Sequence, residues 1–131
     1  MNTQTDDPNF KRFTSALETS LSLFDSVSEW ADVIGFLSRI SKILSSYSHF
    51  TLIPRKSLLA KRLAQCLNPA LPSGVHQKTL EVYALIFQSA GQQQLAQDLP
   101  LWSYGLFPFL QHASVSVKVY TLDSSRSSLF C

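Results

Sequence analysis

Cys66 and His76 are the two residues whose types could support nucleophilic catalysis. A thiolate attacks electrophilic carbon, and an imidazole within reach accepts the thiol proton. The two residues are ten positions apart, on either side of a turn that contains Pro69 and Pro72. A working pair also needs a third group that orients the base, and no residue stands out for that role. A small Cys/His-dependent hydrolase of unrecognised type is therefore the alternative function, while a buried reduced thiol is the interpretation of Cys66 that we favour.

The sequence has no pattern typical of a metal or phosphate site. Its histidines, His49, His76 and His112, each lack a second histidine or a carboxylate at ligand spacing. The four glycines occur singly rather than in a phosphate-binding loop. Cys66 and Cys131 are too few for a disulfide framework. We therefore expect no cofactor, no metal and no enzymatic activity.

Residues 61–87 read KRLAQCLNPALPSGVHQKTLEVYALIF and contain two helical patterns joined by a turn. The first pattern has apolar residues at three- and four-residue spacing. Asn68 ends it, because a residue that precedes a proline is disfavoured in the α region. Ser73 is expected to be the N-cap of the second pattern, which runs from Val75 to a stop at Gly91. The segment is predicted to be an αα-hairpin.

Helical patterns also precede this hairpin. Asp7 followed by Pro8 predicts a helix start, because the carboxylate accepts at the cap and proline suits the first helical position. The spacing of Ser26 and Glu29 predicts a capping box at the start of a second helix. Pro54 is expected to begin a third helix, so that three helices lie before the turn of the hairpin.

The chain after Gly91 is less regular. Residues 92–97 are predicted to form a short helix that leads to Pro100. The aromatic-rich segment 102–110 is expected to pack in the core, because large aromatic side chains are more often buried than part of a ligand cage. Ser114 could cap a further helix.

The fold class is predicted to be all-α, since no window alternates for long enough to form a half-buried strand. Val75-x-x-Lys78 and Val115-x-x-Lys118 lie forty positions apart, and helical repeats of the HEAT or armadillo kind have periods of about 40–47 residues. We therefore expect antiparallel helix pairs stacked as a HEAT/armadillo-like α-solenoid fragment. Gly35 is expected to mark a close helix crossing. The side chains expected to be buried are Phe13, Leu17, Trp30, Leu37, Leu63, Val82 and Phe87.

Positive charge is concentrated in the middle of the chain. No carboxylate occurs from residue 33 to residue 80, and seven basic residues do. A surface of this kind attracts anions such as lipid headgroups, whereas nucleic acid is a weaker expectation because no recognition module is present. The alternatives are an ordinary solvated helix face, or a structural ion pair of Arg62 with a carboxylate such as Glu81. The four residues predicted to bind anionic lipid, which we call the basic face, are Arg55, Lys56, Lys61 and Arg62.

The hairpin also resembles a known family. The run 60–87, with EWAD at 29–32, GLFP at 105–108 and SVK at 116–118, is similar to the N-terminal domain of the Dopey family over roughly residues 10–118. The resemblance implies a scaffold or adaptor in vesicle-mediated protein traffic among endosomes, the Golgi and the endoplasmic reticulum. It implies a Golgi-localised armadillo-type partner, a phospholipid flippase complex and a kinesin motor as partners. It also implies phosphoinositide recognition, and a location in the cytosol and on the cytosolic face of Golgi and endosomal membranes.

The expected domain organisation has three parts. Residues 1–6 are predicted to be a disordered tail, residues 7–118 the Dopey-like helical domain, and residues 119–131 a divergent, disordered tail, because Ser-rich polar sequence disfavours helix. A Dopey chain would continue beyond Lys118 as an apolar helix, so we expect a truncated or alternatively spliced form. No secretory signal and no membrane-spanning stretch is expected.

Overall fold

The computed structural model describes the backbone of residues 3–27 and 29–123, and the side chains of residues 4–27 and 29–112. These residues form helices joined by short turns, and no strand occurs among them, which confirms the prediction of an all-α fold. The elements are η1 (Thr3–Asp6), α1 (Pro8–Leu23), η2 (Phe24–Ser26), α2 (Trp30–Ser46), α3 (Lys56–Cys66) and α4 (Ser73–Asp123), where η denotes a 3-10 turn.

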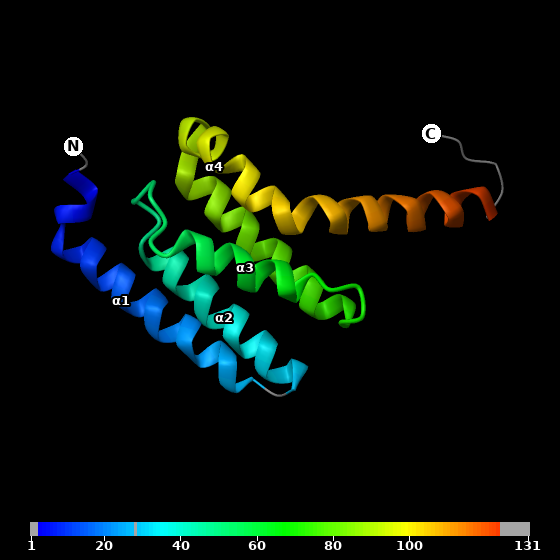
Figure 1. Ribbon diagram of the computed structural model, residues 1–131, viewed down its shortest axis with the longest axis horizontal. Coiled ribbons are helices and arrows are strands. Elements are labelled where there is room, and N and C mark those ends of the chain that lie inside the picture. Colours follow the sequence, from blue (N-terminus) through cyan, green and yellow to red (C-terminus); the bar gives the residue numbers. More distant parts are fainter. Residues whose placement is uncertain (1–2, 28, 124–131) are drawn as a thin grey trace.

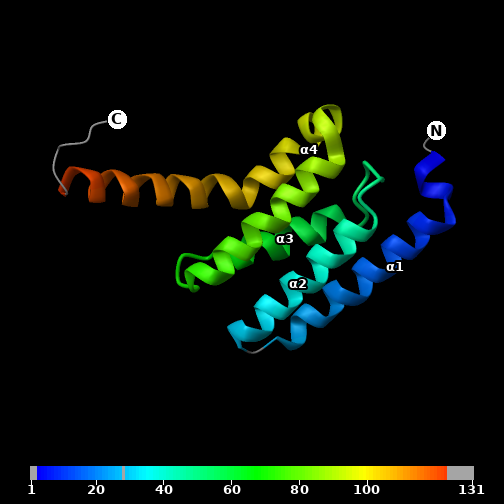
Figure 2. The same ribbon diagram turned by 180° about the vertical axis from the view of Figure 1, so that it is seen from behind.

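Consecutive helices run in opposite directions (Figure 1). α1 packs against α2, and α4 packs against both α2 and α3. α4 bends sharply at Gly91, so we divide it into a first arm (residues 73–90) and a second arm (residues 92–123). Figures 1 and 2 both show the second arm leaving the other helices and extending away from them toward its C-terminal end. The antiparallel arrangement agrees with the expected helix pairs, and stacking as a solenoid stays a prediction.

Gly91 ends the first arm as the sequence predicted. Its backbone has φ 76° and ψ 173°, a combination that is essentially restricted to glycine because a Cβ atom would clash with the backbone. The helix resumes directly afterwards. A single residue therefore turns the chain from one arm into the other.

The start of the chain is more ordered than expected. Thr3–Asp6, which we placed in a disordered tail, form η1, and the Gln4 side chain donates to Thr51 Oγ1 and accepts from the Thr51 backbone N–H, both at 2.8 Å. Asp7 then caps α1 by accepting from Asn9 N at 2.8 Å. Asp7 and Pro8 thus begin α1 as predicted.

Three other helix starts differ from the prediction. The capping box is absent: Ser26 Oγ donates to the Leu23 carbonyl at 2.8 Å, which closes η2, and Glu29 is the N-cap without a side-chain bond. α3 begins at Lys56 rather than at Pro54, because Arg55 has a left-handed φ of 56°. The first arm begins one residue earlier than predicted, since the Pro72 carbonyl already accepts the first backbone bonds.

One apolar core joins all four helices, and five of the seven expected residues lie in it: Phe13, Leu17, Leu37, Leu63 and Val82. Phe87 is partly buried. Trp30 is 54% exposed, so its predicted burial was wrong. It is the first residue of α2, so its side chain lies at the edge of the core rather than inside it.

The second arm does not stop at its prolines. We expected a short helix over 92–97, yet the helix continues through Pro100 and Pro108. A proline inside a helix removes one backbone hydrogen bond and costs about 3 kcal/mol. Both prolines are exposed, so water reaches the carbonyls that they leave free. Ser114, predicted to cap a separate helix, lies inside this one, and its side chain is outside the described residues.

Candidate functional site

The second arm crosses α3 closely at Gly105. A Cβ atom at Gly105 would lie 2.6 Å from Ala64 Cβ and 3.0 Å from Tyr83 Oη, so only a glycine fits without movement. Gly35, where we expected the crossing, has no atom nearer than 3.8 Å to such a Cβ. The Tyr83 hydroxyl is buried without a hydrogen-bond partner among the described residues, and burial raises its pKa above the ordinary value for tyrosine. The close helix crossing is therefore at Gly105.

A groove lies beside this crossing, between α3, the turn that follows it and the second arm. Its volume is about 540 Å³. Lys61 is the one formally charged side chain in the lining, and the remainder is mostly apolar. We call it the α3–α4 groove. Its lining residues are Lys61, Ala64, Gln65, Leu67, Asn68, Pro69, Tyr104, Gly105, Pro108 and Phe109.

The second arm also exposes large apolar side chains. We expected this aromatic-rich segment to pack in the core, and Trp102 does so, with 1% of its surface exposed. No Asp, Glu, Lys or Arg occurs from residue 99 to residue 117. A helix that is apolar on several sides is normally covered by another element. The exposed set, which we call the arm stripe, is Leu99 (51% exposed), Tyr104 (75%), Phe107 (60%) and Leu110 (51%).

The basic face is largely paired with carboxylates. Lys56 Nζ lies 2.8 Å from Asp98 Oδ1, and Arg55 Nε lies 3.9 Å from Glu18 Oε2. Lys61 is exposed and has no ion pair or hydrogen bond among the residues whose side chains are described. The carboxylates come from outside the acid-free span, so a stretch without carboxylates in sequence is not free of them in space. Lipid binding by these residues stays a prediction.

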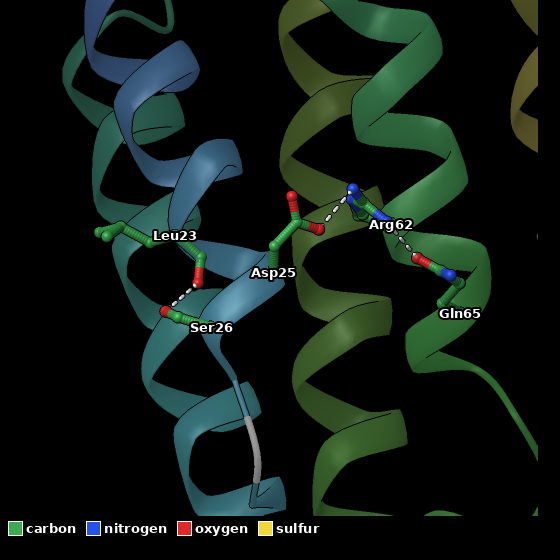
Figure 3. A network of polar contacts seen from close by, with 5 residues as sticks. All are labelled: Leu23, Asp25, Ser26, Arg62 and Gln65. Atoms are coloured by element: carbon green, nitrogen blue, oxygen red, sulfur yellow. Dashed lines mark hydrogen bonds and ion pairs between the residues drawn. The ribbon is translucent and has the colours of Figure 1, made fainter.

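Arg62, the fourth member of the basic face, has a structural role. Its Nη2 donates to Asp25 Oδ1 at 3.0 Å and its Nη1 to Gln65 Oε1 at 3.1 Å (Figure 3). The guanidinium carbon lies 4.9 Å from the centre of the Phe24 ring, and 16% of the side chain is exposed. We weighed a structural pair with Glu81, and the carboxylate is that of Asp25 instead. Arg62 thereby fastens η2 to α3.

The geometry gives no support to catalysis by Cys66 and His76. Cys66 is 1% exposed, and burial raises the pKa of its thiol from 9.0 to about 12, against a hydrogen bond with Thr79 that acts in the opposite direction. At neutral pH the thiolate nucleophile is therefore scarcely populated. His76 Nε2 lies 2.7 Å from the Asn68 carbonyl, and its ring is 4.9 Å from that of Phe109. Through these contacts His76, in the first arm, packs against the turn after α3 and against the second arm.

Among the described residues, no three His, Cys, Asp or Glu side chains are grouped so that they could hold a metal ion. No helix among these residues is both long enough and apolar enough to cross a membrane.

Exposed apolar patches and grooves are common where proteins bind other molecules. Comparison with known families gives the assignment. Residues 7–130 match the family described as Dopey, N-terminal, so this chain belongs to the Dopey family. The match extends past Lys118, where we expected the sequence to diverge.

Several curated relatives are similar to this chain. Protein DOP1B of Xenopus laevis and Protein DOP1B of Mus musculus are each 49% identical over 112 residues, which is 86% of this chain and 5% of the relative. Protein DOP1 of Saccharomyces cerevisiae is 41% identical over 122 residues, or 89% of this chain and 7% of the relative. The chain thus spans about a twentieth of the length of the first two. No solved structure matches it significantly.

Proposed function

We propose that this chain is a non-enzymatic scaffold or adaptor module that binds other proteins through the second arm of α4. The observation that carries the proposal is the arm stripe. Tyrosine is among the residues that contribute most to the binding energy of protein interfaces, and aromatic side chains in general are enriched there. Here they are presented by a helix whose backbone is already ordered, so binding requires little further loss of conformational entropy.

The same surface suits the stacking of helix pairs that the sequence predicts. A repeat unit of a HEAT or armadillo protein cannot bury its apolar face alone, and a neighbouring unit covers it. The curated relatives are many times longer than this chain. We therefore propose that the arm stripe is a stacking or partner-binding surface rather than a solvated face.

The cellular context is proposed from the Dopey resemblance. It is vesicle-mediated protein traffic among endosomes, the Golgi and the endoplasmic reticulum, with the module in the cytosol and on the cytosolic face of Golgi and endosomal membranes. The partners proposed on the same basis are a Golgi armadillo-type protein, a flippase complex and a kinesin motor.

A proximity-labelling experiment tests this function. A biotin ligase is fused to the parent chain and to a variant in which Tyr104, Phe107 and Leu110 are changed to serine. These side chains are exposed, so we expect the variant to fold while its labelling of Golgi and endosomal proteins falls at least fivefold. Leu23→Ser, at a 44%-exposed position on α1, is the matched control and should label like the parent. Equal labelling by all three chains would refute the proposal.

Anionic lipid, in particular a phosphoinositide, is a second proposed ligand. Two residues support it. Lys61 has no partner among the described side chains, and Arg55 has a long ion pair whose two side chains are each 52% exposed. Each basic residue near an anionic surface contributes about 1 kcal/mol. Two such residues give only weak attachment to the membrane. Added salt should weaken it further, because the Debye length is only about 10 Å at 0.1 M.

Liposome co-sedimentation tests the lipid proposal. Lys56 and Arg62 are left unchanged, because reversing them would place a carboxylate beside Asp98 or Asp25. We expect the double variant Arg55→Glu, Lys61→Glu to lose binding to phosphoinositide liposomes. A double variant with Lys11→Glu and Lys42→Glu, two exposed lysines on other helices, controls for net charge. If both variants bind as the parent does, the basic face does not bind lipid.

A further inference from the structure

We propose that the α3–α4 groove binds one amphipathic α-helix of a partner protein, and that this helix carries a carboxylate that pairs with Lys61. The inference rests on the proposed interaction function and names the chemistry of the partner. It concerns the groove, which is a different surface from the arm stripe except that Tyr104 belongs to both.

The shape of the groove follows from the helix crossing. Gly105 and Ala64 hold the second arm and α3 in contact at one point, and the groove opens beside that point. Its volume of about 540 Å³ is within the range of about 300–1,000 Å³ that is common for binding pockets. Tyr104 and Pro108 in its wall are exposed. The groove is therefore open to solvent.

The backbone groups that line the groove favour a helix over an extended peptide as the partner. Two of its walls are helices, whose N–H and C=O groups are paired within each helix except for the carbonyl that Pro108 leaves free. A peptide that binds as an added β-strand gains its affinity mainly from main-chain hydrogen bonds to a free sheet edge, and neither helical wall offers one. A helix brings its own paired backbone and contributes only its apolar side chains, as the mostly apolar lining requires.

The charges around the groove favour a partner that carries negative charge. Lys61 is its one formally charged lining residue and is free of partners among the described side chains. α3 contains no carboxylate, and no Asp, Glu, Lys or Arg occurs in the second arm from residue 99 to residue 117. A carboxylate on the bound helix would therefore meet an unpaired ammonium group and no opposing acid. A basic residue there would be repelled.

Helical peptides of defined design test the inference on the full chain. Peptide E is a 21-residue helix with leucine at positions i, i+3, i+4 and i+7 and glutamate beside the apolar face. Peptide K has lysine in place of those glutamates. Peptide S has the composition of peptide E with the leucines spread around the helix. Each peptide carries a fluorescent label, and its binding to the chain is measured by fluorescence anisotropy.

The expected result is selective binding of peptide E. It should bind about three- to tenfold more tightly than peptide K, because exposed ion pairs contribute modestly, and much more tightly than peptide S. Lys61→Glu should invert the preference between peptides E and K. Lys11→Glu, an equal charge change on α1, should leave it unchanged. Tyr104→Ala should weaken the binding of both helical peptides, since it removes an exposed apolar wall without disturbing the core.

Three results would overturn the inference. The first is that no peptide binds at millimolar concentration. The second is that peptides E and S bind equally well. The third is that the preference for peptide E over peptide K survives Lys61→Glu. If one of them is found while proximity labelling still depends on the arm stripe, the proposed function stands and the groove is not its partner site.

Discussion

Replacing Gly105 by alanine tests whether the second arm is held against α3 as described. The added methyl group would be 2.6 Å from Ala64 Cβ and 2.7 Å from Ala64 Cα. Carbon atoms in contact prefer separations of about 3.5–4.0 Å. The two helices must therefore move apart by about 1 Å, which also disturbs the packing around the buried Tyr83.

The expected magnitude is a balance of two terms. Overpacking of a well-packed site costs about 1–3 kcal/mol. Inside a helix, alanine is more stabilising than glycine by about 0.8–1.0 kcal/mol. The first term is larger, because one of the two clashes is with backbone, which cannot rotate away. With overpacking in the upper part of its range, about 2–3 kcal/mol, the balance lowers the free energy of unfolding of Gly105→Ala by about 1–2 kcal/mol.

Gly35→Ala is the matched control, since it makes the same chemical change inside another helix. No atom except an Arg39 side-chain nitrogen at 3.8 Å lies near the added methyl group. Only the helix-propensity term acts, so this variant should be more stable than the parent by about 0.5–1 kcal/mol. Urea unfolding followed by circular dichroism measures both variants. With a slope of about 2 kcal/mol/M, the two midpoints should move in opposite directions.

A double substitution sharpens the test. Adding Ala64→Gly to Gly105→Ala removes the Cβ contact but leaves the Cα of residue 64 in place, so it should relieve only part of the overpacking. The two changes should therefore be non-additive, by about 0.5 kcal/mol or more. Equal stabilisation by Gly105→Ala and Gly35→Ala would refute the close crossing, and with it the origin of the groove.

Three further predictions have definite expected outcomes. Trp102→Ala should cost about 3–5 kcal/mol, whereas Trp30→Ala, at a 54%-exposed position, should cost less than about 1 kcal/mol; thermal melts compare the two. Gly91→Ala should lower the unfolding free energy by about 1–3 kcal/mol because of its left-handed backbone, and equal urea midpoints would contradict this. The pKa of Cys66 is raised from 9.0 to about 12, so its contribution to stability is complete below pH 9 and is lost as the pH rises toward 12. At about pH 10.5 the parent should have lost about 2 kcal/mol more than Cys66→Ala, relative to pH 7.

Local signals in the sequence located most of the helices. Asp7 and Pro8 predicted a start, and Gly91 predicted a stop, because capping chemistry and glycine's backbone freedom act on the nearest residues. The continuation through Pro100 was not predictable in this way. The penalty of a proline is local, whereas the burial of Trp102 that offsets it depends on α3 and the first arm, which are distant in the sequence.

The candidate site was only partly predictable for the same reason. The four basic residues were identified, but the partners of two of them, Asp25 for Arg62 and Asp98 for Lys56, are 37 and 42 positions away. No pattern in the sequence indicated the groove, because Lys61 and Tyr104 come together only when the second arm packs against α3. Gly105 was the one available clue, and a single glycine inside an apolar segment does not say which helix it faces.

The one-residue corner at Gly91 has a consequence for insertions and deletions. Connections between helices usually contain about 2–8 residues, and such loops absorb a change in length. Here one added residue between Gly91 and Gly105 would rotate everything beyond it by about 100° and bring Tyr104 to the crossing in place of glycine. One deleted residue would bring Leu106 there. Family members should therefore vary in residue type along this stretch while keeping its length of fourteen positions from one glycine to the next.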